Sequence, residues 1–232
     1  MKVVTSISPY NLEIQLSSIN SWINLGMQVY SINVKSEIEE LQKVFKKVIF
    51  IPVQGITSVF GEGFISLDIF LHKAKEVMPN VITIINSDVE LVGSKEQIKR
   101  LIEIGSTGLC MAPRYNYDKG KDKCTVEKFG FDIFSFKTDA IKYLPPSTIT
   151  YGKPLWDYWL PYYLLENRIK LTHVTDKIGI HENHERRWNK LDRLEMIANF
   201  QLDNELNCFD AKEIPLLVRK VVVDNADKIE KI

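Results

Sequence analysis

The chain has 232 residues, of which 45% are hydrophobic and 26% are charged, and its 30 basic and 30 acidic side chains cancel. This composition is typical of a soluble globular protein, and the balanced charge argues against nucleic acid as a partner. Three widely separated cysteines without a C-x-x-C pair favour a reducing compartment over a disulfide framework. The sequence shows neither a signal peptide nor a membrane span, so we expect a cytoplasmic protein.

Short apolar segments rich in Val and Ile alternate with segments of helical period in the first half of the chain. Such apolar segments are typical of strands that are covered on both faces of a sheet. The expected strands cover residues 2–7, 27–32, 48–53, 81–85 and 108–112. Capping-box spacing, which predicts the start of a helix, occurs at Ser36–Glu39 and at Ser94–Gln97. This alternation predicts a layered α/β fold with a mostly parallel sheet.

The second half of the chain has a different rhythm. Residues 115–123 (Y-N-Y-D-K-G-K-D-K) are polar and charged, which predicts an exposed or mobile loop. An aromatic-rich strand is expected at 129–136, and the aromatic block Y-G-K-P-L-W-D-Y-W-L-P-Y-Y follows a Pro-Pro turn. We therefore expect one domain with two functional lobes, residues 1–114 and 115–190, and a helical tail over 191–232.

Several nucleotide-binding and hydrolase signatures are missing from the sequence. There is no G-x-x-x-x-G-K-[ST], no G-x-S-x-G, and no G-x-G-x-x-G after the first strand, where T-S-I-S-P-Y-N stands instead. A nucleotide ligand would therefore need another partner for its phosphates. A divalent cation held by carboxylates meets that need, because Mg²⁺ and Mn²⁺ favour oxygen ligands that include substrate phosphates.

The apolar run V-I-T-I-I leads directly into N-S-D-V-E-L at residues 86–91. Ligands of open α/β sheets bind in the crevice beyond the carboxyl ends of the strands, which is where this polar segment is expected to lie. We predict that Asp88 is a metal ligand, the alternative being a turn acid or a helix cap. Glu90 fits a solvated residue or a support for the site better than a ligand.

The N-S-D-V-E-L segment resembles the D-x-D region of GT-A nucleotide-sugar glycosyltransferases, with Asn86 in place of the first acid and Asp88 as the second. The blocks F-G-F-D-I-F-S-F-K-T-D and Y-G-K-P-L-W-D-Y-W-L-P resemble the acceptor-side half of short GT-A enzymes. The resemblance covers roughly residues 1–190. It implies a GT-A-like, Rossmann-type α/β/α sandwich in which residues 1–114 bind the nucleotide sugar and the irregular second half binds the acceptor.

The resemblance also implies roles for individual residues. Asp157 takes the position of the general base of an inverting transfer, although an acid that begins a helix is commonly an N-cap. His181 and His184 fit the C-terminal histidine that ligates the metal or contacts the diphosphate, the alternative being a polar loop. Trp156 and Tyr158 are candidates for stacking on the acceptor, although most aromatic residues at helical spacing belong to a core.

The candidate contacts to the nucleotide sugar share a position at the carboxyl end of a predicted strand or a positive charge that matches phosphate oxygens. They are Thr5, Ser6, Asn33, Asn86, Ser87, Asp88, Arg114, Arg186 and Arg187. For the two last arginines a charged surface is the equal alternative.

The sequence thus favours a metal-dependent glycosyltransferase that uses Mn²⁺ or Mg²⁺. It would move a hexosyl or deoxyhexosyl group from a UDP- or GDP-sugar to a hydroxyl of a glycan or another acceptor. We expect inversion if Asp157 is the base, and retention is equally open if Asp157 is structural. Two alternatives remain: a sugar-phosphate nucleotidyltransferase, which would need a Gly-rich loop after the first strand, and a non-catalytic carbohydrate- or partner-binding module.

Overall fold

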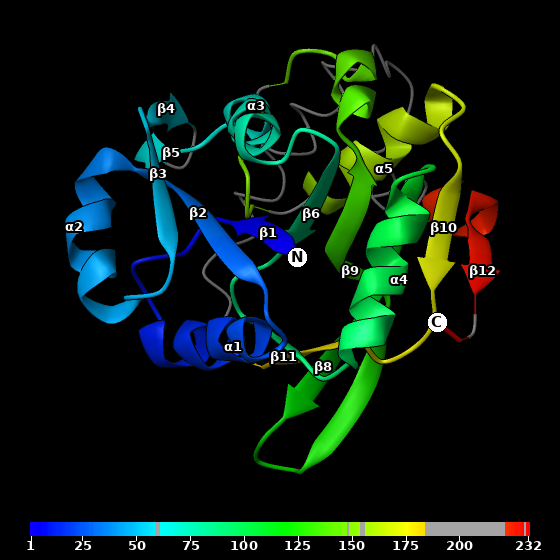
Figure 1. The fold of residues 1–232 in the computed structure, drawn as a ribbon, viewed down its shortest axis with the longest axis horizontal. Coiled ribbons are helices and arrows are strands. Elements are labelled where there is room, and N and C mark those ends of the chain that lie inside the picture. Colours follow the sequence, from blue (N-terminus) through cyan, green and yellow to red (C-terminus); the bar gives the residue numbers. More distant parts are fainter. Residues whose placement is uncertain (59–60, 148, 154–155, 184–220, 230) are drawn as a thin grey trace.

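Four parallel strands organise the N-terminal half of the fold. The computed structural model describes residues 1–232 except 59–60, 148, 154–155, 184–220 and 230 (Figure 1). In it, four of the expected strands lie side by side in the order β3-β2-β1-β6 and pair in parallel. They are β1 (Lys2–Thr5), β2 (Gln28–Val34), β3 (Ile49–Val53) and β6 (Val81–Ile85). The predicted parallel sheet is thereby confirmed.

The second half extends the same sheet with one antiparallel insertion. Strand β9 (Lys123–Lys137) runs antiparallel between β6 and β8 (Leu109–Asp118). Beyond β8 follow β10 (Leu171–Val174) and β12 (Asp227–Ile229), each parallel to its neighbour. Strand β12 lies in the segment that was expected to be a helical tail; in the described end of that segment, residues 221–225 are helical and β12 forms the edge of the sheet. A small hairpin of β4 (Ile56–Ser58) and β5 (Gly61–Phe64) lies outside the large sheet.

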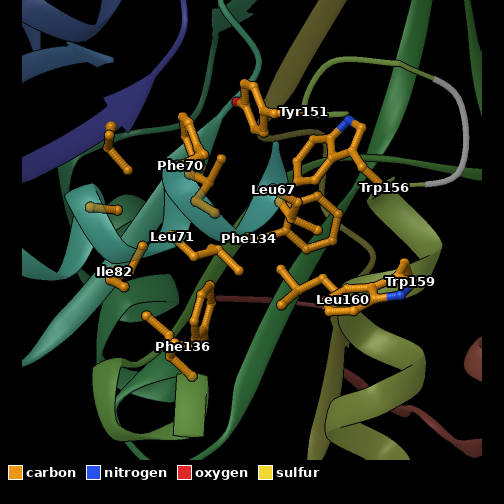
Figure 2. Close-up of a cluster of buried hydrophobic side chains, with 14 of the residues drawn as sticks. Leu67, Phe70, Leu71, Ile82, Phe134, Phe136, Tyr151, Trp156, Trp159 and Leu160 are labelled. Atoms are coloured by element: carbon orange, nitrogen blue, oxygen red, sulfur yellow. The ribbon is translucent and has the colours of Figure 1, made fainter. Parts of the chain in front are cut away.

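Helices cover both faces of the sheet and make the fold a layered α/β/α sandwich (Figure 1). One face carries α3 (Leu67–Val77), the 3-10 helix η1 (Thr138–Tyr143) and α5 (Trp156–Glu166). The other face carries α1 (Leu12–Asn24), α2 (Lys35–Val44) and α4 (Lys95–Gly105). Figure 2 shows the aromatic core of the first face. None of the described helices combines the length and apolarity that crossing a membrane requires.

Only one of the two predicted capping boxes is present. The Ser94 hydroxyl accepts from the backbone of Gln97 and the Gln97 side chain accepts in return, so α4 begins as predicted. The box predicted at Ser36 is wrong. Strand β2 runs directly into α2, which begins at Lys35 without a side-chain cap, so Ser36 already lies inside the first turn.

The predicted loop at residues 115–123 is mostly a β-hairpin, and this prediction is wrong. The outer parts of β8 and β9 pair from Arg114–Glu127 to Asp118–Lys123, and the hairpin projects beyond the body of the fold (Figure 1). Its turn is held by the Asp118 side chain, which accepts from the backbone N–H of Gly120 at 3.1 Å. Because both faces of this ribbon are largely open to solvent, its strands have no apolar pattern by which they could be predicted.

A small strand pair builds one wall of the carboxyl edge of the sheet. Strand β11 (Gly179–Glu182) pairs antiparallel with β7 (Val89–Leu91) and parallel with β8. Gly179 permits this close approach, because a Cβ atom built there would lie 2.6 Å from Val89 Cγ1 and 3.0 Å from Ile133 Cδ1. Val89 and Ile133 are buried, so neither side chain has space to retreat.

We expect Gly179→Ala to lower the free energy of unfolding by roughly 1–3 kcal/mol, because the added methyl group overpacks a closed core. The matched control is Gly120→Ala in the exposed hairpin turn, where a Cβ would meet its nearest neighbour at 3.4 Å. We expect that control to change stability by less than about 0.5 kcal/mol. Urea unfolding followed by circular dichroism measures both, and equal effects would contradict the role given to Gly179.

His173 predicts a pH dependence of stability. Its side chain on β10 is buried edge-on against Phe131, and neither ring nitrogen has a hydrogen-bond partner in the described part of the chain. Burial, aided by the charge of Lys228, lowers the pKa of His173 below its ordinary value of 6.5. Below pH 6.5 the imidazole of His173 binds a proton more readily in the unfolded chain than in the folded chain. The contribution of His173 to the free energy of unfolding is therefore complete above pH 6.5 and is lost as the pH falls through the lowered pKa.

We therefore expect the free energy of unfolding to fall between pH 7.5 and pH 5, and to fall less in His173→Leu. His72→Gln, at an exposed position on α3, is the control and should keep the wild-type pH dependence. Urea titrations at several pH values measure the slopes, and identical slopes in His173→Leu and wild type would exclude this origin.

Candidate functional site

Asp88 lies at the carboxyl edge of the sheet, in the turn that joins β6 to β7. The turn is closed by the backbone N–H of Val89, which donates to the carbonyl of Asn86 at 3.0 Å. The Asp88 side chain keeps 28% of its surface exposed, so it is neither free surface nor core. This placement is the one expected from the strand pattern.

Asp88 and His181 meet although 92 residues separate them in the chain. Pairing of β11 with β7 sets His181 opposite Val89, and His181 Nε2 lies 3.3 Å from Asp88 Oδ2. The imidazole is only 13% exposed. The structure therefore brings together two of the three residues that the sequence suggested as metal ligands, and the third, His184, lies outside the described residues.

The donor atoms of this pair are spaced as two ligands of one cation would be. Metal–ligand bonds of about 2.1 Å at right angles place their donor atoms about 3.0 Å apart. A carboxylate oxygen and an imidazole nitrogen suit Mn²⁺, and a cation bound through few protein groups takes its remaining ligands from phosphate oxygens and water. Within the described residues, no three His, Cys, Asp or Glu side chains form a ready metal site. Asp88 and His181 are therefore two residues of metal-ligand type that could together hold a cation.

A buried carboxylate that the sequence analysis did not single out lies beside this pair. Asp132 on β9 is 1% exposed and accepts two hydrogen bonds from Arg114, at 2.5 Å from Nε and 2.6 Å from Nη2. Asn86 Nδ2 donates a third at 2.7 Å, and the Asn86 backbone N–H donates to the Asp132 carbonyl at 3.0 Å. We name Asn86, Asp132 and Arg114 the Asp132 network.

Arg114 owes its place to an irregularity in the β8–β9 pairing. Ala112 pairs with Ile133, but Arg114 already pairs with Glu127, so the register shifts where β8 passes Pro113. Such bulges redirect side chains, and here the guanidinium reaches Asp132. Asp132, and behind it Asp157 and Asp88, raise the pKa of Arg114, which keeps its charge at every physiological pH.

The other residues of the N-S-D segment are fixed by the loop that follows β1. The Ser87 hydroxyl donates to Gln15 Oε1 at 2.7 Å, and the same oxygen accepts from the backbone N–H of Ser8. Gln15 Nε2 donates to the carbonyls of Ser8 and Tyr10, so this buried amide joins the loops after β1 and β6. The Ser87 hydroxyl therefore helps to position the turn that carries Asp88.

Thr5 and Asn33 lie at the carboxyl ends of β1 and β2, as the sequence predicted, but both are fully buried. Asn33 Nδ2 donates to the carbonyl of Ile7 at 2.7 Å and to Glu37 Oε2 at 3.0 Å, which ties the start of the β1 loop to α2. Ser6 is half-buried beside it. In this structure Asn33 shapes the loop, and contact of these residues with a nucleotide stays a prediction.

Tyr151 is a buried aromatic residue of the core on the face that carries α3 and α5. Its ring stacks on Phe70 with centroids 3.7 Å apart and lies beside Trp156 (Figure 2). Burial raises the pKa of Tyr151; the adjacent Thr5 hydroxyl acts in the opposite direction, and the charges of Asp88 and Asp132 add smaller increases. The phenol therefore stays protonated and can only act as a neutral hydrogen-bonding group.

Asp157 lies in the first turn of α5 and is half-buried. The helix N-terminus stabilises a negative charge there. Pro161 has no N–H, so the helical hydrogen bond to the carbonyl of Asp157 cannot form. The charge of Asp157, like those of Asp132 and Asp88, helps to raise the pKa of Arg114. Asp157 thus lies at a helix start, within electrostatic range of Arg114.

The two predicted acceptor-stacking residues are core residues in this structure. Trp156 is 3% exposed and packs against Phe134, and Tyr158 is 2% exposed and packs edge-on against Phe131. Neither ring offers a face to a ligand, because α5 buries them against the sheet. The Glu90 side chain is exposed, as expected for a solvated residue. Arg186 and Arg187 lie outside the described residues.

Sequence reasoning missed Asp132, Gln15 and Tyr151. A signal for Asp132 existed, because it is the single acid within the apolar strand F-G-F-D-I-F-S-F. A charge in such a strand is costly to bury unless it is paired, so it marks a polar network. Gln15 and Tyr151 carry no such mark, since a glutamine on a helix and an aromatic before one are common.

Comparisons with known proteins concern the fold. No protein-family model matches the sequence, and no curated protein matches it. The structure is similar to one described as a nucleotide-diphospho-sugar transferase from Desulfovibrio desulfuricans, with 8% identity over 99% of this chain and 98% of that chain and a TM-score of 0.44. It is also similar to a glucose-1-phosphate thymidylyltransferase from Bacillus anthracis (10% identity, 90% and 97% coverage, TM-score 0.44). A third is 4-diphosphocytidyl-2C-methyl-D-erythritol synthase from Anaerococcus prevotii (9% identity, 87% and 95% coverage, TM-score 0.43). Likenesses of this size do not assign an activity.

Proposed function

We propose that this protein transfers a sugar from a nucleotide-diphosphate donor to a hydroxyl acceptor with the help of a divalent cation. The observation that carries the proposal is the 3.3 Å approach of His181 Nε2 to Asp88 Oδ2 at the carboxyl edge of the sheet. These are residues of metal-ligand type from distant parts of the chain, and they meet where ligands of open α/β sheets bind.

The charge of the site supports a need for a cation. Asp132 binds the guanidinium of Arg114, and the charges of Asp157 and Asp88 also act on it. Carboxylates at this edge of the sheet repel a diphosphate unless a cation offsets their charge. A cation held by Asp88 and His181 removes that repulsion, and when bound it also neutralises charge that develops on the leaving diphosphate.

The position of Asp157 supports its role as a general base. In the proposed step its carboxylate accepts the proton of the acceptor hydroxyl, and the oxygen of that hydroxyl forms a bond to the anomeric carbon. The bond from that carbon to the diphosphate oxygen breaks, and the electron pair leaves with the diphosphate. Attack from the face opposite the leaving group inverts the anomeric centre.

The loop after β1 argues against nucleotidyl transfer. Gln15 binds the backbone of Ser8 and Tyr10, and Asn33 binds the carbonyl of Ile7. The loop contains no glycine, and its Ile7 and Ser8 N–H groups donate to the Ser31 hydroxyl and to Gln15 Oε1, so these two donors are not open to a triphosphate. Binding of UTP or GTP with release of pyrophosphate from a sugar phosphate would instead support the nucleotidyltransferase.

Asp88→Asn should weaken Mn²⁺-dependent binding of UDP or GDP at least about 100-fold, because the neutral amide loses both the charge and a strong metal ligand. Glu90→Gln, two residues away and exposed, is the matched control and should bind as the wild type does. Isothermal titration calorimetry with and without Mn²⁺ measures the affinities. Equal Mn²⁺-dependent affinity in Asp88→Asn and wild type would rule out the assignment.

Asp157→Asn should leave Mn²⁺-dependent binding of UDP or GDP within about threefold of wild type and lower the rate of sugar transfer roughly 100-fold to 10,000-fold, the usual share of a general base. The measurement is transfer from the nucleotide sugar whose diphosphate binds best, with a panel of glycan acceptors. The matched control is Asp139→Asn in η1, which removes a carboxylate away from the site. An unchanged rate of sugar transfer in Asp157→Asn would mean that Asp157 has a structural role in α5 and is not the general base.

A further inference from the structure

The Asp132 network is built around a charge that the fold alone does not require. Asp132 lies between Phe131 and Ile133 on a strand whose other neighbours are apolar, and it is 1% exposed. A buried ion pair adds little to stability compared with apolar side chains of the same size, because desolvation offsets the attraction. Its common benefit is a fixed geometry, and here the fixed group is Arg114.

The geometry of the pair leaves one side of the guanidinium available. Asp132 occupies the N–H groups of Nε and one of those of Nη2. The outer edge, formed by Nη1 and the second N–H of Nη2, makes no hydrogen bond to the described part of the chain. Such an edge matches two phosphate oxygens. Arg114 is 30% exposed, and through Asp132 it is tied to Asn86, which begins the turn that carries Asp88.

Asn86 completes the network because it is an amide. Its Nδ2 donates to the same Asp132 oxygen that accepts from Arg114 Nη2. A carboxylate at position 86 has no hydrogen to donate and would repel Asp132. The asparagine that departs from the D-x-D pattern is therefore the residue that Asp132 needs at this place.

We propose that Asp132 is a positioning residue which, together with Asn86, holds the outer edge of Arg114 against an anionic oxygen of the donor diphosphate. This inference rests on the proposed function, since it assumes that a diphosphate binds beside Asp88. Asp132 contributes no contact to the ligand, and its effect passes through Arg114 alone.

A double-mutant cycle on full-length protein tests the inference, with Mg²⁺ and UDP or GDP as the probe. We expect Arg114→Lys and Asp132→Asn each to weaken binding about 10-fold to 100-fold, as the loss of a charge-assisted hydrogen bond would. The double variant should be no weaker than Arg114→Lys, because the two residues act as one unit. The control Glu103→Gln breaks the exposed Arg100–Glu103 pair and should bind as the wild type does.

A spectroscopic measurement separates positioning from a general loss of structure. In ¹H–¹⁵N spectra the Nε–H of Arg114, assigned by its loss in Arg114→Lys, should exchange slowly and shift when Mg²⁺ and the diphosphate are added. In Asp132→Asn this signal should broaden or disappear while the backbone amide spectrum stays folded. Asn86→Leu, which removes one hydrogen bond but no charge, keeps the test possible if Asp132→Asn does not fold.

Three outcomes are distinguishable. Wild-type protein that binds neither UDP nor GDP with a metal contradicts the proposed function and this inference with it. Normal binding that survives Asp132→Asn, or losses that add in the double variant, contradicts the inference alone. A wild-type Arg114 signal that the bound diphosphate does not move also contradicts it.

Discussion

The ion pair between Asp132 and Arg114 is the interaction on which the candidate site depends. It joins three segments that the chain delivers separately: the end of β6 through Asn86, the bulge of β8 through Arg114, and the middle of β9. Because the pair is buried, neither residue can be replaced alone without destabilising the protein. Removing either partner would leave an uncompensated charge at a cost of several kcal/mol. The carboxyl edge of the sheet is therefore a fixed frame before any ligand arrives.

The candidate site residues around this ion pair and the core residues below them come from different parts of the fold. The turn after β6 supplies Asn86 and Asp88, the strands supply His181, Arg114 and Asp132, and the start of α5 carries Asp157. Aromatic residues of α5 fill the core beneath the site and hold the helix against the sheet (Figure 2). Adjacent residues of this helix thus differ in burial, with Asp157 half-buried and its neighbours Trp156 and Tyr158 buried.

Much of the fold could be predicted from the sequence where burial imposes a pattern. Strand β6 matches its expected residues 81–85 because a run of Val and Ile covered on both faces ends at polar residues. The outer part of the β8–β9 hairpin was not predictable in this way, since its side chains face solvent and alternate without an apolar side. The start of α2 was missed because a strand leads into it without a capping residue.

The candidate site was predictable only in part, and for a physical reason. Asp88 could be located from its own strand, because the end of a buried parallel strand fixes which edge it reaches. Its approach to His181 depends on the β7–β11 pairing, and the bond between Asn86 and Asp132 depends on the antiparallel insertion of β9. Such contacts between distant strands are set by topology, which a local pattern of residue types does not encode.

The hydrogen bond from Asn86 to Asp132 also constrains how this sequence can drift over evolutionary time. An acid at position 86 and an acid at position 132 exclude each other unless a proton or a cation is trapped between them, whereas one acid and one amide are compatible in either order. A substitution that places an acid at one of these positions is therefore tolerated only after the acid at the other has been replaced. Among descendants of this chain, the two positions should vary together, and the pair would carry a record of which strand bears the charge.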